Sequence, residues 1–137
     1  MMQGNVLIPE LDVLNNIRMP SELSGRNIDE TELQTFLEIL RITHILKSYP
    51  SEVSGGEYRR VMLARILPLH TEILIADEPT LNLDAGSAEI VRNVLNEYAN
   101  NDHILIVSTH DSLLAPQAGK TSYWLLNQSM VFNRFCI

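Results

Sequence analysis

The spacing of apolar residues changes along this chain, and the change comes after Pro50. Before Pro50, apolar side chains recur at helical spacing across residues 33–40, and Asn27 or Asp29 precedes them as a candidate helix cap. The stretch PELDVLNNIRMP predicts a shorter helix, which opens at its first proline and closes near its last. We therefore expect the first part of the chain to be helical.

Short apolar runs of strand length alternate with helical patterns in the rest of the chain. Residues 71–77 and 103–111 each hold an apolar run that ends in polar side chains, and residues 84–101 between them predict an amphipathic helix. Two apolar strands joined by one helix indicate a βαβ unit, whose parallel sheet is expected to be buried on both faces. The aromatic and β-branched residues of 121–126 and 129–135 predict two further strands. The predicted fold class is therefore α/β, with a mostly parallel sheet and flanking helices.

Polar clusters follow both of the apolar strands. Asp77 and Glu78 end the first strand, and Ser108, Thr109 and His110 end the second. Parallel sheets bind ligands at the carboxyl ends of their strands, so both clusters are placed at one candidate site. A carboxylate at Asp77 suits Mg²⁺, Glu78 suits the polarisation of an attacking water, and His110 suits a hydrogen bond to a terminal phosphate. A solvated acidic turn is the plain structural alternative.

The sequence SGGE, residues 54–57, stands at the mouth of a predicted helix. Gly55 and Gly56 let the backbone approach a ligand closely, and the free N–H groups of a helix N-terminus attract anions. The Ser54 hydroxyl adds a hydrogen-bond donor. Together these features indicate a phosphate clamp, and a simple loop with a helix cap is the alternative.

A glycine-lysine-threonine sequence near the end of the chain matches the last three residues of the P-loop pattern. The segment AGKT, residues 118–121, lacks the upstream glycine of the full pattern, because Leu114 stands there and Pro116 follows it. A P-loop also runs from a strand into a helix, whereas this segment is expected to run from a short helix into a strand. Lys120 is therefore not expected to hold a phosphate.

The composition describes an ordinary globular chain of one domain's length. Its 137 residues are 45% hydrophobic and 20% charged, and the net charge of −7 argues against nucleic acid as the main partner. The single cysteine, Cys136, excludes an internal disulfide. No apolar run approaches the roughly 18 residues of a membrane span, and the start lacks signal-peptide features, so we expect a cytoplasmic protein. His44, His70 and His103 show no metal-ligand spacing and are interpreted as structural or surface residues.

Three ordered stretches, VSGGEYRRVMLAR, ILIADEPTLNLD and VSTHD, closely resemble the motifs of the ATP-binding-cassette (ABC) ATPases. The run from Gln3 through VLNNIRMP is similar to the Q-loop and early helical subdomain of ABC transporter ATPases, in particular those of lipoprotein release and macrolide export. The resemblance implies a partial P-loop NTPase fold of the ABC type. Residues 1–58 would be the Q-loop and helical (signature) subdomain, and residues 59–137 a RecA-like α/β core.

The resemblance also implies a role for each candidate residue. It makes Glu78 the catalytic glutamate and His110 the switch histidine, and it makes Asp77 and Gln3 the ligands of Mg²⁺. The residues implied to contact nucleotide or to communicate across a dimer are Gln3, Ser54, Gly55, Gly56, Glu57 and Asp84. The implied cofactors are ATP and Mg²⁺. The implied partners are a second ABC ATPase domain and a membrane permease, through which the chain would be peripheral to the inner or plasma membrane.

The P-loop of this family lies before the Q-loop, and Gln3 is the third residue of the chain. The resemblance therefore implies that the P-loop segment is absent, that the chain alone binds ATP weakly and has little or no ATPase activity, and that an apolar face is exposed. The main interpretation is the ATP-binding subunit of an ABC transporter, in which ATP hydrolysis drives export. The alternative is a non-catalytic module or relic that lends its signature motif to an intact partner. A DNA-repair or chromosome-type ABC ATPase is disfavoured, because no sustained heptad pattern precedes the signature.

Overall fold

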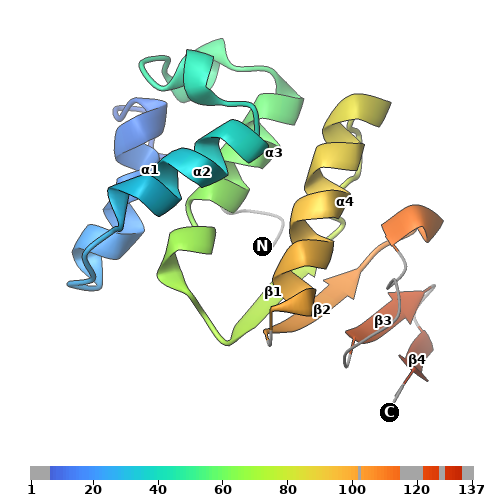
Figure 1. Ribbon diagram of the computed structural model, residues 1–137. Coiled ribbons are helices and arrows are strands. Elements are labelled where there is room, and N and C mark those ends of the chain that lie inside the picture. The colour runs from blue at the N-terminus through green and yellow to red at the C-terminus, as the bar shows by residue number, and fades with distance from the viewer. Residues whose placement is uncertain (1–6, 102, 115–121, 127–128, 134–137) are drawn as a thin grey trace. The chain divides into compact units, whose positions relative to one another are not determined.

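A computed structural model of the protein describes residues 7–101, 103–114, 122–126 and 129–133 (Figure 1). The chain divides into two compact units: residues 5–71 form a helical unit, and residues 1–4 with 72–137 form an α/β unit. The functional boundary after residue 58 stays a prediction. Gln3, Cys136 and the AGKT segment lie outside the described residues.

The helical unit consists of three α-helices and three short 3₁₀ helices. In chain order these are α1 (Val13–Leu23), α2 (Glu30–Ile39), η1 (Thr43–Ile45), η2 (Pro50–Glu52), α3 (Gly55–Ala64) and η3 (Leu67–Leu69). Helix α3 contacts both α1 and α2. Each helix turns an apolar stripe toward the others, and the side chains buried between them include Val13, Ile17, Leu33, Leu37, Val61 and Leu63. The expectation of a helical first part is met.

The bounds of α1 differ from those predicted. The helix was expected to open at Pro9, but it begins at Val13 because the Asp12 side chain accepts the backbone N–H of Asn15 at 2.8 Å. A side-chain acceptor at the cap satisfies one of the free N–H groups of the first turn, which a proline cannot do. The predicted end near Pro20 is also wrong, since the helix continues through Pro20. A proline near the helix end removes only one helical hydrogen bond, so the last turn still forms.

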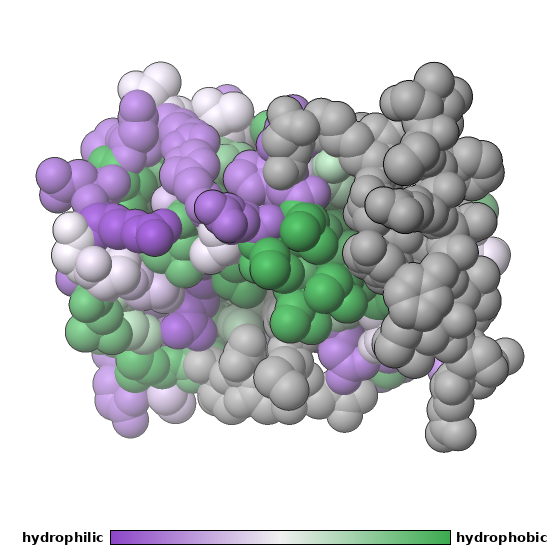
Figure 2. Space-filling view, turned by 90° about the horizontal axis from the view of Figure 1, so that it is seen from below, coloured by the Kyte–Doolittle hydropathy of each residue, from purple (hydrophilic) through white to green (hydrophobic). Residues whose placement is uncertain are grey.

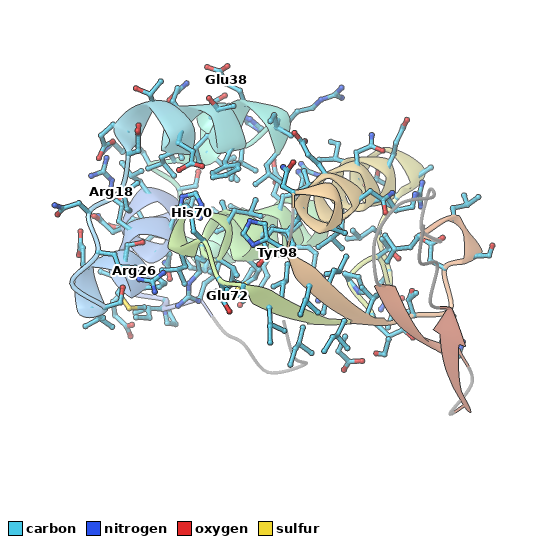
Figure 3. All side chains as sticks on the ribbon, turned by 60° about the horizontal axis from the view of Figure 1, so that its bottom comes forward. Arg18, Arg26, Glu38, His70, Glu72 and Tyr98 are labelled. Carbon is cyan, nitrogen blue, oxygen red and sulfur yellow. The ribbon has the colours of Figure 1, made fainter. Side chains whose placement is uncertain are left out.

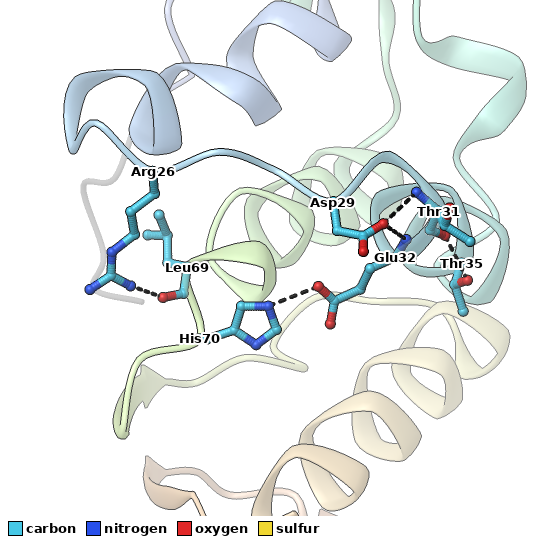
Figure 4. Close-up of polar contacts among 7 residues, drawn as sticks. All are labelled: Arg26, Asp29, Thr31, Glu32, Thr35, Leu69 and His70. Carbon is cyan, nitrogen blue, oxygen red and sulfur yellow. Dashed lines mark hydrogen bonds and ion pairs between the residues drawn. The ribbon is translucent and has the colours of Figure 1, made fainter.

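Polar contacts fasten the loop before α2 and the first turn of α2 to the segment after η3 (Figure 4). Asp29, one of the two predicted caps, accepts two backbone N–H bonds in the first turn of α2. Glu32 on the same turn lies 2.8 Å from Nε2 of His70, which follows η3 with a left-handed φ of 45°. The Arg26 guanidinium donates to the backbone carbonyl of Leu69. These bonds hold the loop before α2 against the segment that leaves η3.

The α/β unit is built on a four-stranded sheet with the strand order β1-β2-β3-β4 (Figure 1). Its elements are β1 (Ile73–Asp77), α4 (Ala85–Asn100), β2 (Ile104–Ser108), η4 (Ser112–Leu114), β3 (Ser122–Leu126) and β4 (Ser129–Asn133). Strands β1 and β2 are parallel, as are β2 and β3, whereas β4 is antiparallel to β3. The predicted βαβ unit and mostly parallel sheet are therefore present.

The two faces of the β1–β2 pair differ in burial. Leu74, Ala76, Leu105 and Val107 are buried on one face, and α4 packs against β2 with Val91 and Leu95 fully buried. On the other face the exposed fractions of Ile73, Ile75 and Ile104 are 51%, 54% and 40%. Figure 2 shows hydrophobic side chains gathered in a patch on the face seen from below. The expected burial of both faces is therefore wrong for the described residues, because α4 covers one face only, whereas the expected exposed apolar face is present.

No helix within the described ranges is long and apolar enough to cross a bilayer.

Candidate functional site

The site in the α/β unit starts where β1 and β2 end side by side. Asp77 and Ser108 are the last residues of these strands and are partners in the sheet register. The Ser108 hydroxyl donates a hydrogen bond to Oδ1 of Asp77. The backbone N–H of Glu78 donates to the Ser108 carbonyl at 2.8 Å. The parallel register thus brings both predicted polar clusters to one edge of the sheet.

Glu78 takes an unusual backbone conformation at this edge. Its φ is 42°, in the left-handed region that costs a non-glycine residue roughly 1–2 kcal/mol. Its carboxylate, with 17% of the side chain exposed, reaches the loop after β2. There Oε2 accepts the His110 backbone N–H at 3.3 Å, and Oε1 lies 3.6 Å from His110 Nε2. Strain at a strand exit is typical of functional sites, and here it accompanies the approach of the carboxylate to His110.

Asp111 and Arg92 adjoin this pair, and neither was among the predicted site residues. Arg92 of α4 lies 2.9 Å from Asp111, with 17% and 18% of the two side chains exposed. Burial alone would raise the pKa of Asp111, but hydrogen bonds from Arg92, from the Leu113 backbone N–H and with the Thr80 side chain outweigh it and hold the pKa below its usual value. Asp111 could have been suspected because it follows His110, but no motif pairs it with a residue on α4.

Asp84 is the cap before helix α4 and the last residue of the stretch ILIADEPTLNLD. Its side chain accepts the Ser87 backbone N–H at 2.9 Å and caps the helix. Hydrogen bonds from the Ser87 hydroxyl and backbone hold the pKa of Asp84 below its usual range. This cap gives Asp84 a local structural role, and its implied role across a dimer stays a prediction.

The SGGE motif lies in the helical unit, at the start of α3. The Ser54 side chain accepts the Glu57 backbone N–H, and one Glu57 oxygen accepts from the Ser54 backbone N–H at 2.8 Å and from its hydroxyl at 2.7 Å. The other Glu57 oxygen lies 3.0 Å from Nε2 of His44. These bonds, first those from Ser54 and then that from His44, hold the pKa of Glu57 below its usual range. The motif therefore forms the reciprocal cap of an α-helix.

Gly55 has no structural need for glycine within the described chain. Its φ is not left-handed, since Gly25 is the positive-φ glycine of the described residues. A Cβ built on Gly55 would meet nothing within 4 Å. Open space beside the first turn of α3 suits a group that approaches the backbone from outside the chain.

The other three histidines have protein partners; Figure 3 labels His70 and Tyr98, the partner of His103. His44 lies against Glu57, and His70 lies against Glu32. The ring of His103 stacks on Tyr98, with 4.5 Å between the ring centroids. Among the described residues no three His, Cys, Asp or Glu side chains gather as a metal site. The paired oxygens of Asp77 and Ser108 nevertheless fit Mg²⁺, which keeps several waters and takes few protein ligands beside a phosphate.

Residues 1–81 match the family described as ABC transporter. A lipoprotein-releasing system ATP-binding protein, LolD, of Shewanella denitrificans is 41% identical over 82% of this chain and 50% of its own length. A macrolide export ATP-binding/permease protein, MacB, of Campylobacter jejuni is 35% identical over 82% of this chain and 18% of its own. The chain thus spans about half the length of the LolD relatives that it matches.

Two solved structures of the protein MJ0796 resemble the fold. One, a dimeric bacterial ABC transporter cassette, superposes on 94% of this chain and 58% of its own with a TM-score of 0.75 and 26% identity. The other, described as a post-hydrolysis state bound to ADP and Pi, superposes on 98% of this chain and 62% of its own with a TM-score of 0.75 and 27% identity. The predicted family, its resemblance to lipoprotein-release and macrolide-export proteins, and the fold class are confirmed.

Proposed function

Because this chain belongs to the ABC transporter family, we propose that it serves as the ATP-binding component of an exporter of the lipoprotein-release or macrolide-export kind. The observation that carries this proposal is the contact of Glu78 with His110 beside Asp77, at the edge where β1 and β2 end. These three side chains come from two of the motifs that resemble the family.

The proposed chemistry is ATP hydrolysis. Glu78 is the general base that takes a proton from the attacking water, and its distance of 3.6 Å from His110 supports the action of both groups on one phosphate. His110 donates a hydrogen bond to that γ-phosphate, and its ring is open to a ligand because 71% of the side chain is exposed. Asp77, with Gln3, would hold Mg²⁺, which offsets the charge of the phosphates when bound.

The SGGE motif, residues 54–57, resembles the signature motif of the family and is proposed to act on a second ATPase domain. Ser54, Gly55, Gly56 and Glu57 would contact the ATP held by that domain, and Asp84 would communicate across the dimer. The open space beside Gly55 supports an outside ligand, and the MJ0796 cassette with which the chain superposes is dimeric. A membrane permease would be the other partner, which places the chain at the cytoplasmic side of the membrane. The alternative is a non-catalytic module. In that case the SGGE motif would contact the partner's ATP, but Glu78 would take no part in hydrolysis.

The test combines calorimetric titration of the chain with Mg-ATP and turnover measurements with and without the complete LolD relative of Shewanella denitrificans. The chain alone is expected to turn over little ATP, so the turnover that it contributes is measured beside LolD. If Glu78 is the base, Glu78→Gln lowers that contribution by about 100-fold or more and leaves ATP affinity unchanged. The matched control is Glu89→Gln, on an exposed position of α4, which should behave as wild type.

The possible outcomes separate the two candidates. A chain that neither binds nor hydrolyses ATP but changes the turnover of LolD would be a non-catalytic module. A chain that shows no nucleotide binding, no turnover and no effect on LolD would contradict both forms of the proposal.

A further inference from the structure

One ion pair of the described chain is more sequestered than the others. Arg92 Nη1 of α4 lies 2.9 Å from Asp111 Oδ2, and only 17% and 18% of these side chains are exposed. Each of the other four ion pairs between described residues includes a side chain that is more than half exposed. A partly buried, hydrogen-bonded ion pair fixes its two side chains far better than a surface pair does.

Asp111 organises the loop after β2 from its centre. Its Oδ1 accepts the Leu113 backbone N–H at 3.0 Å, and its own backbone N–H donates to the Thr109 hydroxyl at 3.0 Å. A hydrogen bond with Thr80 links it to the turn after β1. Thr80 and Thr109 are 8% and 4% exposed, so the bonds to these two residues are shielded from solvent, whereas the Leu113 bond is exposed. Through Asp111, Arg92 joins α4 to the exits of both β1 and β2.

His110 lies between Thr109 and Asp111 in this loop. Its ring is 71% exposed, so the packing of the ring itself does little to place it. Its contacts with Glu78, the backbone bond of 3.3 Å and the ring distance of 3.6 Å, depend on where the loop backbone runs. The residues on either side of His110 are the ones that hold that backbone.

We propose that Arg92 is a positioning residue of the hydrolytic site, which acts by holding Asp111 so that the loop keeps His110 against Glu78. The consequence for turnover rests on the proposed function, whereas the placement of His110 does not. A purely structural role for the ion pair would stabilise the whole α/β unit evenly. A positioning role acts on the loop, because Arg92 is the contact that ties Asp111 to α4, and its loss would loosen the loop while the sheet keeps its own bonds.

The experiment measures backbone amide hydrogen exchange by NMR on the full chain for three variants and a control. Arg92→Met keeps an unbranched apolar stem and removes the charge and the donors, and Arg92→Lys returns the charge. Asp111→Asn keeps the oxygen that accepts from Leu113. Glu97→Gln removes a charge from an exposed position of the same helix and serves as the control.

With Arg92→Met and Asp111→Asn, the His110 amide should exchange about tenfold faster, while the Leu105 amide in the middle of β2 changes less than about twofold. Arg92→Lys should recover at least part of the protection, and Glu97→Gln should match wild type. An equal acceleration at His110 and Leu105, or none at His110, would overturn the proposal.

Where the wild type turns over ATP, Arg92→Met should lower kcat with an unchanged KM for ATP, because Arg92 acts through Asp111. A fall in kcat with unchanged exchange at His110 would also count against positioning. Absence of wild-type turnover even beside LolD would weigh against Glu78 as the base and would leave the exchange result to decide the role of Arg92.

Discussion

Substitution of Gly55 by alanine separates what the signature motif does for the fold from what it does for function. The change adds one methyl group in the first turn of α3, where the built Cβ meets nothing within 4 Å and φ is not left-handed. Alanine at such a position restricts the unfolded chain and strains nothing in the folded one. It should therefore stabilise the helical unit by about 0.5 kcal/mol.

Gly25 provides a matched control in the same unit. A Cβ on Gly25 also meets nothing within 4 Å, but its φ is +67°. Alanine there must adopt the left-handed region, which should destabilise the unit by about 1 kcal/mol. The two substitutions add the same methyl group to equally open space, so they should change stability with opposite signs because of φ alone.

The assay is urea unfolding followed by far-UV circular dichroism, with turnover measured beside LolD. If Gly55 lets a phosphate of the partner approach the backbone, the stabilised Gly55→Ala chain should lose about 100-fold or more of any effect on turnover. Gly25→Ala should keep its effect once the fraction folded is matched. Loss of stability in Gly55→Ala would refute the structural reasoning, and full function in that variant would refute the proposed signature site.

Two further predictions concern buried polar groups. Asn16→Ala should destabilise the helical unit by about 3 kcal/mol in urea unfolding, because Asn16 is fully buried, accepts from the Ile8 backbone N–H at 2.7 Å and donates to three backbone carbonyls. The lowered pKa of Asp111 adds stability above the ordinary value of 3.8, and this stability is lost as the pH falls through the lower folded pKa. The stability difference between wild type and Asp111→Asn, measured from pH 6 to pH 3, should therefore shrink toward the acid end; a constant difference would contradict this.

Elements that depend on neighbouring residues were predictable from the sequence. The runs ending at Asp77 and Ser108 became β1 and β2, since an apolar run that stops at a polar residue has the length and composition of a buried strand. Asp29 and Ser54 cap their helices because a cap needs only the next three residues. The start of α1 was missed because Pro9 and Asp12 both favour a helix start, and the prediction used Pro9.

Contacts between distant residues were not predictable in the same way. The ion pair between Arg92 and Asp111 and the contact between His44 and Glu57 join residues on different elements. Which side of a helix meets a loop depends on how the helix packs, and no local motif contains that information. The candidate site was thus identified by residue type and order, whereas the bonds that hold its members came only from the structure.

The two faces of the β1–β2 pair show which packing places the site. Ile73 and Ile75 are as apolar as Leu74 and Ala76, so the sequence predicts a strand that is buried on both faces. In the structure, the described residues bury only the face that carries Leu74 and Ala76. Asp77 and Ser108 are nevertheless aligned, because register and the α4 crossover determine where parallel strands end. The edge at which β1 and β2 end is therefore set within the βαβ unit. This explains how a chain that matches about half the length of its LolD relatives has Asp77 beside Ser108 and Glu78 beside His110.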